Sequence, residues 1–203
     1  MGGIRVIRKT TMIVALACMA LAPVPALAQQ SNGLLFLEAV KKRDGAKATD
    51  FVSRSGSTVI NARDFGEGNG GLHFMVRERD LTWVSFLLGK GANVDLQNKA
   101  GNTPLALAAQ IGWVEGAQLL LGRKAQVDLP NAGGETPLIH AVHKRDLGMV
   151  RLLLGAGANP KRPDSKAGYS ALDYAKQDRR AAAVLKVLEA GAEKPREAAG
   201  PVL

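Results

Sequence analysis

Cysteine, aromatic residues and long apolar runs are all scarce in this sequence of 203 residues. The single cysteine, Cys18, excludes both an internal disulfide framework and a zinc site built on several thiolates. Aromatic residues make up only 4% of the chain, which argues against a surface that stacks nucleic acid bases. The one apolar run that approaches membrane-spanning length lies near the N-terminus, so a protein with several membrane spans is excluded.

Hydrophobic residues account for 46% of the chain, which is too many for a disordered protein. They are enough for one medium-sized core or for a short repeat array. Lys and Arg outnumber Asp and Glu by 27 to 18. Part of this excess belongs to the N-terminal segment, because residues 29–203 carry 24 basic residues against the same 18 acidic ones.

The first 28 residues have the pattern of a secretory signal peptide. Three basic residues and no acidic one precede an apolar stretch at 12–21, and two prolines follow it. Ala26, Leu27 and Ala28 then form a small-residue cleavage motif of the A-x-A type. We expect cleavage between Ala28 and Gln29, which would make the mature chain periplasmic or secreted.

Cys18 leaves an alternative, which is a lipidated N-terminus. The bulky Leu16 and the apolar residues that continue past Cys18 fit a lipoprotein signal poorly, so an ordinary cleaved signal is favoured. A membrane anchor is disfavoured too, because an apolar run of about ten residues is too short to span a bilayer.

Two motifs recur through the rest of the chain with a common period of 33 residues. The first motif, Gly-x-Thr-Pro-Leu, stands at 101–105 and 134–138, with weaker versions at 68–73 and 168–172. The second is an apolar segment followed by small residues, found at 86–92, 119–125, 152–158 and 187–192. Because two independent motifs keep one period, the chain is read as a repeat array.

On these motifs the sequence resembles the ankyrin repeat family, which has a Thr-Pro-Leu-His signature and a 33-residue period. The resemblance covers residues 32–192. It implies an all-α ankyrin repeat solenoid of about five helix–turn–helix repeats with short β-turn fingers. The expected units are a cleaved signal peptide (1–28), an N-terminal capping repeat (29–63), ankyrin repeats at 64–97, 98–130 and 131–164, a C-terminal capping repeat (165–192) and a disordered tail (193–203).

The boundaries of the first helices can be predicted from capping residues. Thr103 and Thr136 are expected as N-caps, each followed by a proline at the first helical position. The second repeat has Gly70 and Gly71 at these two positions and should therefore lack a hydroxyl cap. In the first repeat, a cap near residues 31–32 is expected to begin a helix over 34–42.

Glycine is expected where the second helix of each repeat ends. Gly91, Gly157 and Gly191 occupy this position and should adopt a left-handed conformation. Lys124 stands at the equivalent place in its own repeat, where a left-handed lysine costs roughly 1–2 kcal/mol.

No catalytic constellation is found, and the protein is not expected to be an enzyme or to hold a cofactor or metal. His140 and His143 are three residues apart on an expected helix, but no third ligand accompanies them. We expect His140 to pack at a helix interface and His143 to be exposed. His73 stands in the signature position and is expected to support its finger turn by hydrogen bonding.

An Arg-Asp pair recurs at the turn between the two helices of a repeat. It occurs as Arg43-Asp44, Arg79-Asp80 and Arg145-Asp146. The arginines could form a column that grips an acidic ligand. Alternatively, each aspartate caps the second helix and each arginine is solvated. The second interpretation is favoured, because each adjacent carboxylate cancels much of the positive field.

The resemblance implies that the protein binds another protein through its concave face, formed by the finger tips and the exposed sides of the first helices. The candidate contact residues are Arg77, Lys99, Asn102, Gln110, Ile111, Trp113, His143, Lys144 and Tyr169. Trp113 is included because its place at a turn between helices predicts exposure, whereas Trp83 is expected in the core. Ile111 and Tyr169 are the apolar and aromatic candidates.

Two further classes of partner are nucleic acid and anionic envelope surfaces. Nucleic acid is disfavoured, because basic residues are scattered along the repeats and aromatics are few. Electrostatic binding to anionic envelope surfaces remains the alternative to protein binding. High salt would abolish it and would spare a buried apolar contact.

Overall fold

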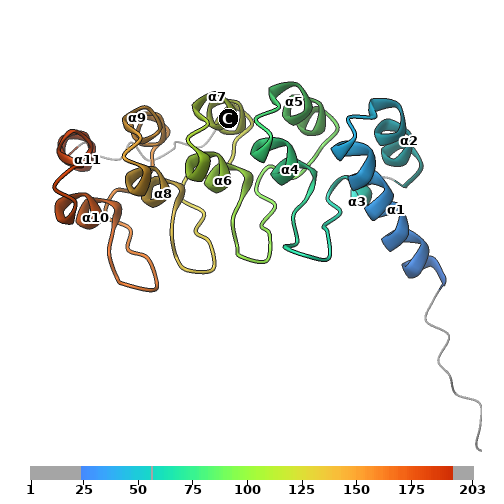
Figure 1. Cartoon of the computed structure of the whole chain (residues 1–203), viewed down its shortest axis with the longest axis horizontal. Helices are drawn as coiled ribbons and strands as arrows, with labels where there is room; N and C mark the ends of the chain where they lie inside the picture. The colour runs from blue at the N-terminus through green and yellow to red at the C-terminus, as the bar shows by residue number, and fades with distance from the viewer. Residues whose placement is uncertain (1–23, 56, 194–203) are drawn as a thin grey trace, which may run out of the picture.

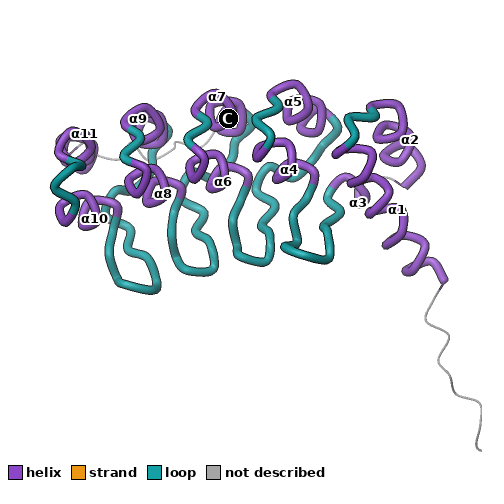
Figure 2. Tube along the Cα trace, in the orientation of Figure 1, coloured by secondary structure: helices purple, strands orange, loops and turns teal. Residues whose placement is uncertain are grey.

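The computed structural model describes residues 24–55 and 57–193. Within these residues the chain forms eleven α-helices and no β-strand (Figure 2). Two isolated β-bridges, Arg63 with Gly70 and Pro163 with Ser170, close the bases of two finger loops. The prediction of an all-α fold is therefore confirmed. Most of the expected signal peptide, with Cys18, and residues 194–203 of the expected tail lie outside the described residues.

The helices form two parallel rows, with finger loops extending beyond one of them (Figure 1). The row next to the fingers contains the first helices of the repeats: α1 (Val24–Lys41), α4 (Gly71–Arg77), α6 (Pro104–Ile111), α8 (Pro137–Lys144) and α10 (Ala171–Gln177). The other row contains the second helices: α2 (Gly45–Ser55), α5 (Leu81–Gly89), α7 (Val114–Gly122), α9 (Leu147–Gly155) and α11 (Ala182–Glu193). A short helix, α3 (Ser57–Ile60), follows α2.

The core lies between the two rows and continues from repeat to repeat. Leu87, Leu105, Leu120, Leu138 and Leu153 are all fully buried in it. No single helix pair could bury its apolar faces alone, so stacking of the repeats creates the core.

The predicted caps of α6 and α8 are confirmed. Thr103 accepts a hydrogen bond from the Ala106 N–H at 3.1 Å, and Thr136 accepts one from the Ile139 N–H at 3.4 Å. Each is followed by proline at the start of the helix. A backbone N–H at this position has no acceptor within the helix, so its absence in proline costs no hydrogen bond.

Gly70, the N-cap of α4, and Gly71, its first residue, provide no side-chain cap but allow close packing. A Cβ on Gly70 would lie 2.5 Å from Leu96 Cδ2, and one on Gly71 would lie 3.3 Å from a Leu87 methyl group. The Gly70 N–H is bonded by the imidazole of His73. The second repeat therefore lacks a hydroxyl cap, but its two glycines allow closer packing, and the His73 imidazole accepts the Gly70 N–H.

The ends of the second helices follow the glycine prediction with one exception. Gly91 and Gly157 have φ angles of 89° and 91°, and Lys124 has a φ of 64°. The prediction for Gly191 is wrong, because this residue lies inside α11. A Cβ there would be 3.1 Å from Leu154 methyl groups, so Gly191 permits close packing of α11 on α9 and ends no helix.

Helix α1 starts earlier than expected. It begins at Val24 and runs across the expected cleavage position. Pro25 is compatible with this because proline is tolerated in the first turn of a helix. Among the α1 residues whose burial is described, the buried ones begin at Gly33. None of the described helices combines the length and the apolar character needed to cross a membrane.

Candidate functional site

The finger loops are held by one Asp or Asn side chain each. The four equivalent residues are Asp64, Asn98, Asn131 and Asp164. In the first finger Asp64 Oδ1 accepts the Gly68 N–H at 2.7 Å, and in the last Asp164 Oδ1 accepts the Ala167 N–H at 2.8 Å. Asn98 and Asn131 accept loop N–H groups in the same way. These hydrogen bonds give each loop a defined conformation despite its glycine content.

Adjacent fingers are joined by one backbone hydrogen bond per junction. The bonds run from the Lys99 N–H to the Glu67 carbonyl (2.9 Å), from Ala132 to Ala100 (3.0 Å) and from Ser165 to Gly133 (2.9 Å). This ladder fixes the spacing of the fingers along the array.

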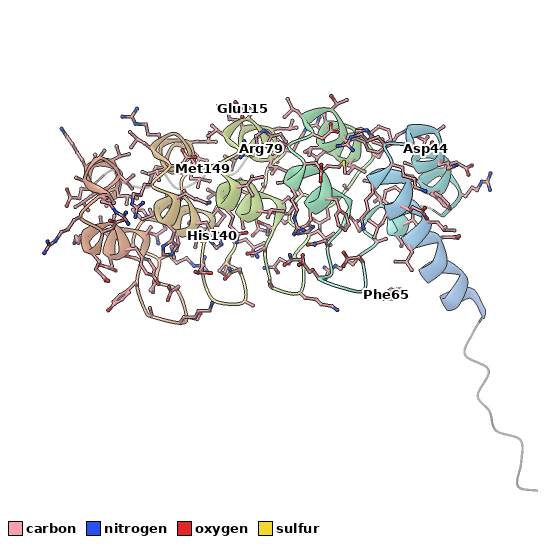
Figure 3. All side chains as sticks on the ribbon, in the orientation of Figure 1. Asp44, Phe65, Arg79, Glu115, His140 and Met149 are labelled. Carbon is pink, nitrogen blue, oxygen red and sulfur yellow. The ribbon has the colours of Figure 1, made fainter. Side chains whose placement is uncertain are left out.

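Two candidate side chains in the N-terminal half are engaged within the protein. Arg77 pairs with Glu67, with Nη2 and Oε2 3.1 Å apart. Lys99 Nζ donates to the carbonyl of Phe65 at 2.6 Å. Phe65 lies at the tip of the first finger (Figure 3), and 61% of it is exposed. Sequence reasoning did not single it out.

Asn102 and Gln110 belong to a polar network that links two repeats. Gln110 Nε2 lies 3.3 Å from Asn102 Oδ1 and 3.2 Å from His140 Nε2, and Asn131 Nδ2 donates to the same Asn102 oxygen at 3.2 Å. His140 is buried, as predicted, and burial lowers its pKa. The neutral imidazole can then accept the amide hydrogen of Gln110.

His73 has the structural role that was predicted. Its Nδ1 accepts the Gly70 N–H at 3.2 Å, and its Nε2 donates to the Asn102 carbonyl 2.9 Å away. The ring is fully buried, and this burial lowers its pKa. Because one nitrogen accepts and the other donates, the pattern requires the neutral form.

The expected exposure of Trp113 is wrong. Only 6% of Trp113 is exposed, because its ring folds over Gly116, where a Cβ would lie 2.0 Å from the ring atom Cε3. Ile111 is also partly buried against the core. Trp83, expected in the core, is only partly buried and stacks edge-on with Phe86 at 4.9 Å between ring centroids.

The aspartates of the recurring Arg-Asp pairs cap the second helices, as predicted. Asp44 accepts from the Lys47 N–H at 3.0 Å, Asp80 from Trp83 at 3.0 Å and Asp146 from Met149 at 2.9 Å. Hydrogen bonding to the Lys47 N–H holds the pKa of Asp44 below its usual value.

The arginines of these pairs are exposed, as the favoured interpretation predicts, but each also makes a contact within the protein that the sequence did not predict. Arg43, Arg79 and Arg145 have φ angles of 59°, 53° and 54°. From this left-handed turn each side chain reaches the following repeat. The contacts are Arg43 Nε to Asp80 Oδ2 (2.8 Å), Arg79 Nη2 to the Ile111 carbonyl (2.6 Å) and Arg145 Nε to Asp178 Oδ2 (2.5 Å).

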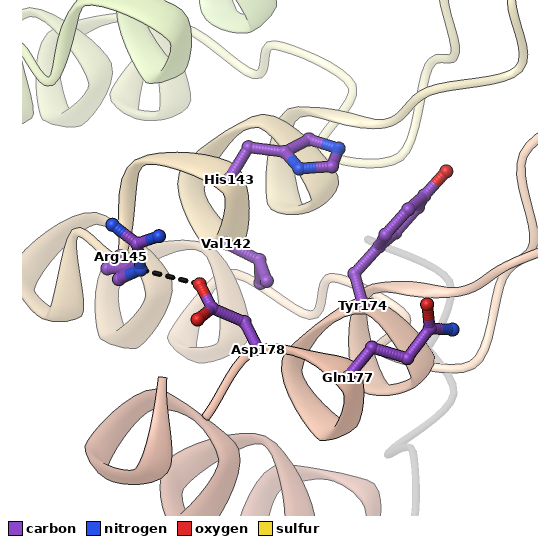
Figure 4. A pocket seen from close by; sticks show the side chains of 6 residues that line it. All are labelled: Val142, His143, Arg145, Tyr174, Gln177 and Asp178. Carbon is purple, nitrogen blue, oxygen red and sulfur yellow. Dashed lines mark hydrogen bonds and ion pairs between the residues drawn. The ribbon is translucent and has the colours of Figure 1, made fainter. Parts of the chain in front are cut away.

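An open groove of about 360 Å³ lies between α8 and α10 (Figure 4). It is lined by Val142 and His143 of α8, by Tyr174 and Gln177 of α10, and by the residues that directly follow these helices, Arg145 and Asp178. The Arg145–Asp178 ion pair closes one side. His143 is exposed, as predicted, and lines this groove.

Two of the predicted contact residues, His143 and Tyr169, both contact the ring of Tyr174. The Tyr174 ring lies 4.5 Å from His143 and 5.6 Å from Tyr169, between centroids. The Tyr174 hydroxyl donates to Asp164 Oδ2 at 2.5 Å, and this bond raises the pKa of Tyr174 to about 12. Tyr174 was missed from the sequence, although it stands one repeat after His140.

The side chains at this surface can make noncovalent contacts with a partner. Among residues 24–55 and 57–193, no three His, Cys, Asp or Glu side chains gather so that they could hold a metal ion. The groove offers an aromatic ring, an imidazole, an amide and an internally paired guanidinium.

Helix pairs stacked in two rows, with a hydrogen-bonded ladder of fingers, define a helical repeat solenoid. Residues 72–164 match the family model described as ankyrin repeats (3 copies). This segment of the chain consists of ankyrin repeats, and such repeats generally serve as scaffolds for protein–protein interaction. No curated protein matches the chain at a significant level.

Proposed function

We propose that this protein is an exported, non-enzymatic scaffold that binds a partner protein through the C-terminal half of its concave face. Its ankyrin repeats support the general role of binding another protein. The groove between α8 and α10 supports the location.

The observation that carries the proposal is the pre-formed aromatic wall of this groove. Tyr174 is held by Asp164, which is itself fixed by the N–H groups of Lys166, Ala167 and Gly168. A ring that is already immobile loses little conformational entropy on binding. Rigid aromatic side chains of this kind are frequent anchors of protein interfaces.

The N-terminal half of the concave face is a weaker candidate. Arg77 and Lys99 are committed to contacts within the array, and Asn102 and Gln110 to the network with His140. Around the groove, by contrast, Lys144 and Gln177 are exposed and make no side-chain hydrogen bond within the described part of the chain.

Export is proposed from the signal pattern of the first 28 residues. Removal of these residues would leave the α1 residues that are described as buried in place, because these begin at Gly33. The intact mass of protein recovered from the cell envelope tests this proposal. A chain that starts at Gln29 supports export, and a full-length cytoplasmic chain contradicts it.

Partner binding is tested by affinity capture from envelope extract at low and high salt. The variant Tyr169→Ala/His143→Ala/Gln177→Ala changes two groove residues and Tyr169, which contacts Tyr174. It should lose a protein that the wild type retains in high salt. The control variant Gln118→Ala/Arg151→Ala/Lys186→Ala changes three exposed residues of α7, α9 and α11 and should retain it. Only salt-labile, lipid-associated material would favour the electrostatic alternative.

A further inference from the structure

Helix α7 lacks the side-chain cap that begins the second helices on either side of it. Asp80 caps α5 and Asp146 caps α9, each by accepting a hydrogen bond from the backbone N–H three residues later. Trp113 stands at the equivalent position of α7, and its side chain makes no capping hydrogen bond. Without a polar cap, the first turn of a helix is easier to unwind.

The side-chain bond from the turn before α7 to the next repeat is missing as well. In the equivalent turns Arg43, Arg79 and Arg145 each donate to the following repeat. Gly112 occupies this place before α7, where a Cβ would lie 3.1 Å from Asp146 Oδ2. Within the described residues, Asp146 Oδ2 accepts no hydrogen bond, so α7 and α9 lack the side-chain contact that joins their counterparts.

The buried face of α7 is made of smaller residues than the buried faces of its neighbours. The buried residues are Gly116, Ala117 and Leu120 in α7, Val84, Leu87 and Leu88 in α5, and Met149, Val150 and Leu153 in α9. The large ring that packs over Gly116 is that of Trp113, which belongs to the turn before the helix. Because α7 itself removes less apolar surface from water, detaching it costs less free energy.

The segments on both sides of α7 are bonded to another repeat, which limits how far an opening can extend. Before the helix, the Ile111 carbonyl accepts Arg79 Nη2 at 2.6 Å. After it, the Gln126 N–H donates to Asp95 Oδ1 at 2.9 Å. Lys124 lies between these contacts with a φ of 64°, and its strain is released when the end of α7 unwinds.

We infer that α7 opens locally, over residues 113–125, while the repeats before and after it stay folded. This opening divides the row of second helices between α5 and α9. The first helices α6 and α8 stay joined by the contact of Gln110 with His140, and their fingers by the Ala132–Ala100 hydrogen bond. The groove lies between α8 and α10, so the inference goes beyond the proposed function and does not depend on it.

Hydrogen–deuterium exchange of the full chain, followed by mass spectrometry, tests this inference. After correction for intrinsic rates, the amides of residues 117–121 in α7 should exchange about tenfold or more faster than those at the equivalent positions, 84–88 in α5 and 150–154 in α9. Low concentrations of urea should change the α7 rate little, because a local opening exposes little surface. Equal protection of the three helices would overturn the inference.

Three matched variants distinguish a local opening from unfolding of the whole array. Gly89, Gly122 and Gly155 are the last residues of α5, α7 and α9, and a Cβ on each would meet no atom within 4 Å. Gly122→Ala should slow the exchange of residues 117–121 about two- to fivefold, because alanine favours the helical state. Gly89→Ala and Gly155→Ala should leave this rate unchanged. Equal slowing by all three variants would show that α7 opens only when the whole array unfolds, which contradicts the inference.

Discussion

The Tyr174 hydroxyl and the Asp164 carboxylate are 2.5 Å apart, and their hydrogen bond joins the first helix of the last repeat to its finger. Asp164 also accepts three N–H groups of that finger. One contact therefore fixes both the aromatic wall of the groove and the loop that carries Lys166.

Tyr174→Phe keeps the ring and removes this hydrogen bond. We expect the free energy of unfolding to fall by about 1–2 kcal/mol, because the donor to a carboxylate is lost. In an alkaline absorbance titration, the wild type should show one of its two tyrosines ionising with a pKa of about 12, and the variant should lack it. Two tyrosines that ionise together near the ordinary value would contradict the contact.

Two glycines of α7 should respond to alanine in opposite directions. Gly116→Ala should lower the free energy of unfolding by about 1–3 kcal/mol, because the new Cβ meets the Trp113 ring and overpacks the site. Gly122→Ala should raise it by about 0.5–1 kcal/mol, because that Cβ would meet no atom within 4 Å. Denaturant unfolding measures both, and a stabilising Gly116→Ala would refute the buried position of Trp113.

Lys124→Gly should stabilise the fold by about 1 kcal/mol, because Lys124 has a φ of 64° and glycine has no strain there. The reciprocal change, Gly157→Lys, should destabilise the equivalent turn, where φ is 91°. Thermal melts of the two variants should therefore shift in opposite directions. A lower melting temperature for Lys124→Gly would contradict the account of this turn.

Stability should decrease as the pH falls below about 6.5, the pKa of histidine in the unfolded chain. Burial lowers the pKa of His73 and of His140 in the folded state, so the unfolded state binds more protons in this range. Each histidine contributes a slope of up to about 1.4 kcal/mol per pH unit between its folded pKa and 6.5.

The pH dependence can be assigned to these two residues by substitution. His73→Gln and His140→Gln should each be less stable than the wild type at neutral pH, with a shallower loss of stability on acidification. The double variant should lose most of the slope. A double variant as acid-sensitive as the wild type would assign the effect to other groups.

The elements that sequence reasoning predicted depend on contacts close along the chain. The caps at Thr103 and Thr136 bond the backbone three residues later, and the left-handed turns at Gly91 and Lys124 are single-residue conformations. Because these features recur with the 33-residue period of the repeats, their positions can be predicted from the sequence.

The features that were missed or wrong depend on side-chain contacts, within a repeat or between repeats, that the repeat pattern does not fix. Arg43 and Arg145 reach residues 37 and 33 positions away, and the orientation of neither side chain follows from the local pattern. Trp113 is buried because Gly116 leaves room for its ring. Tyr174 gains its role from Asp164, ten residues earlier in a different element.

Site-specific photo-crosslinking tests the location of the binding surface most directly. A benzoylphenylalanine at Gln177 would lie in the groove, whereas one at Gln118 would lie on the exposed side of α7. The account predicts that the Gln177 position crosslinks one partner protein in the cell envelope and that the Gln118 position does not. A crosslink to the same protein from Gln118 alone, or equally from both positions, would contradict binding at the groove.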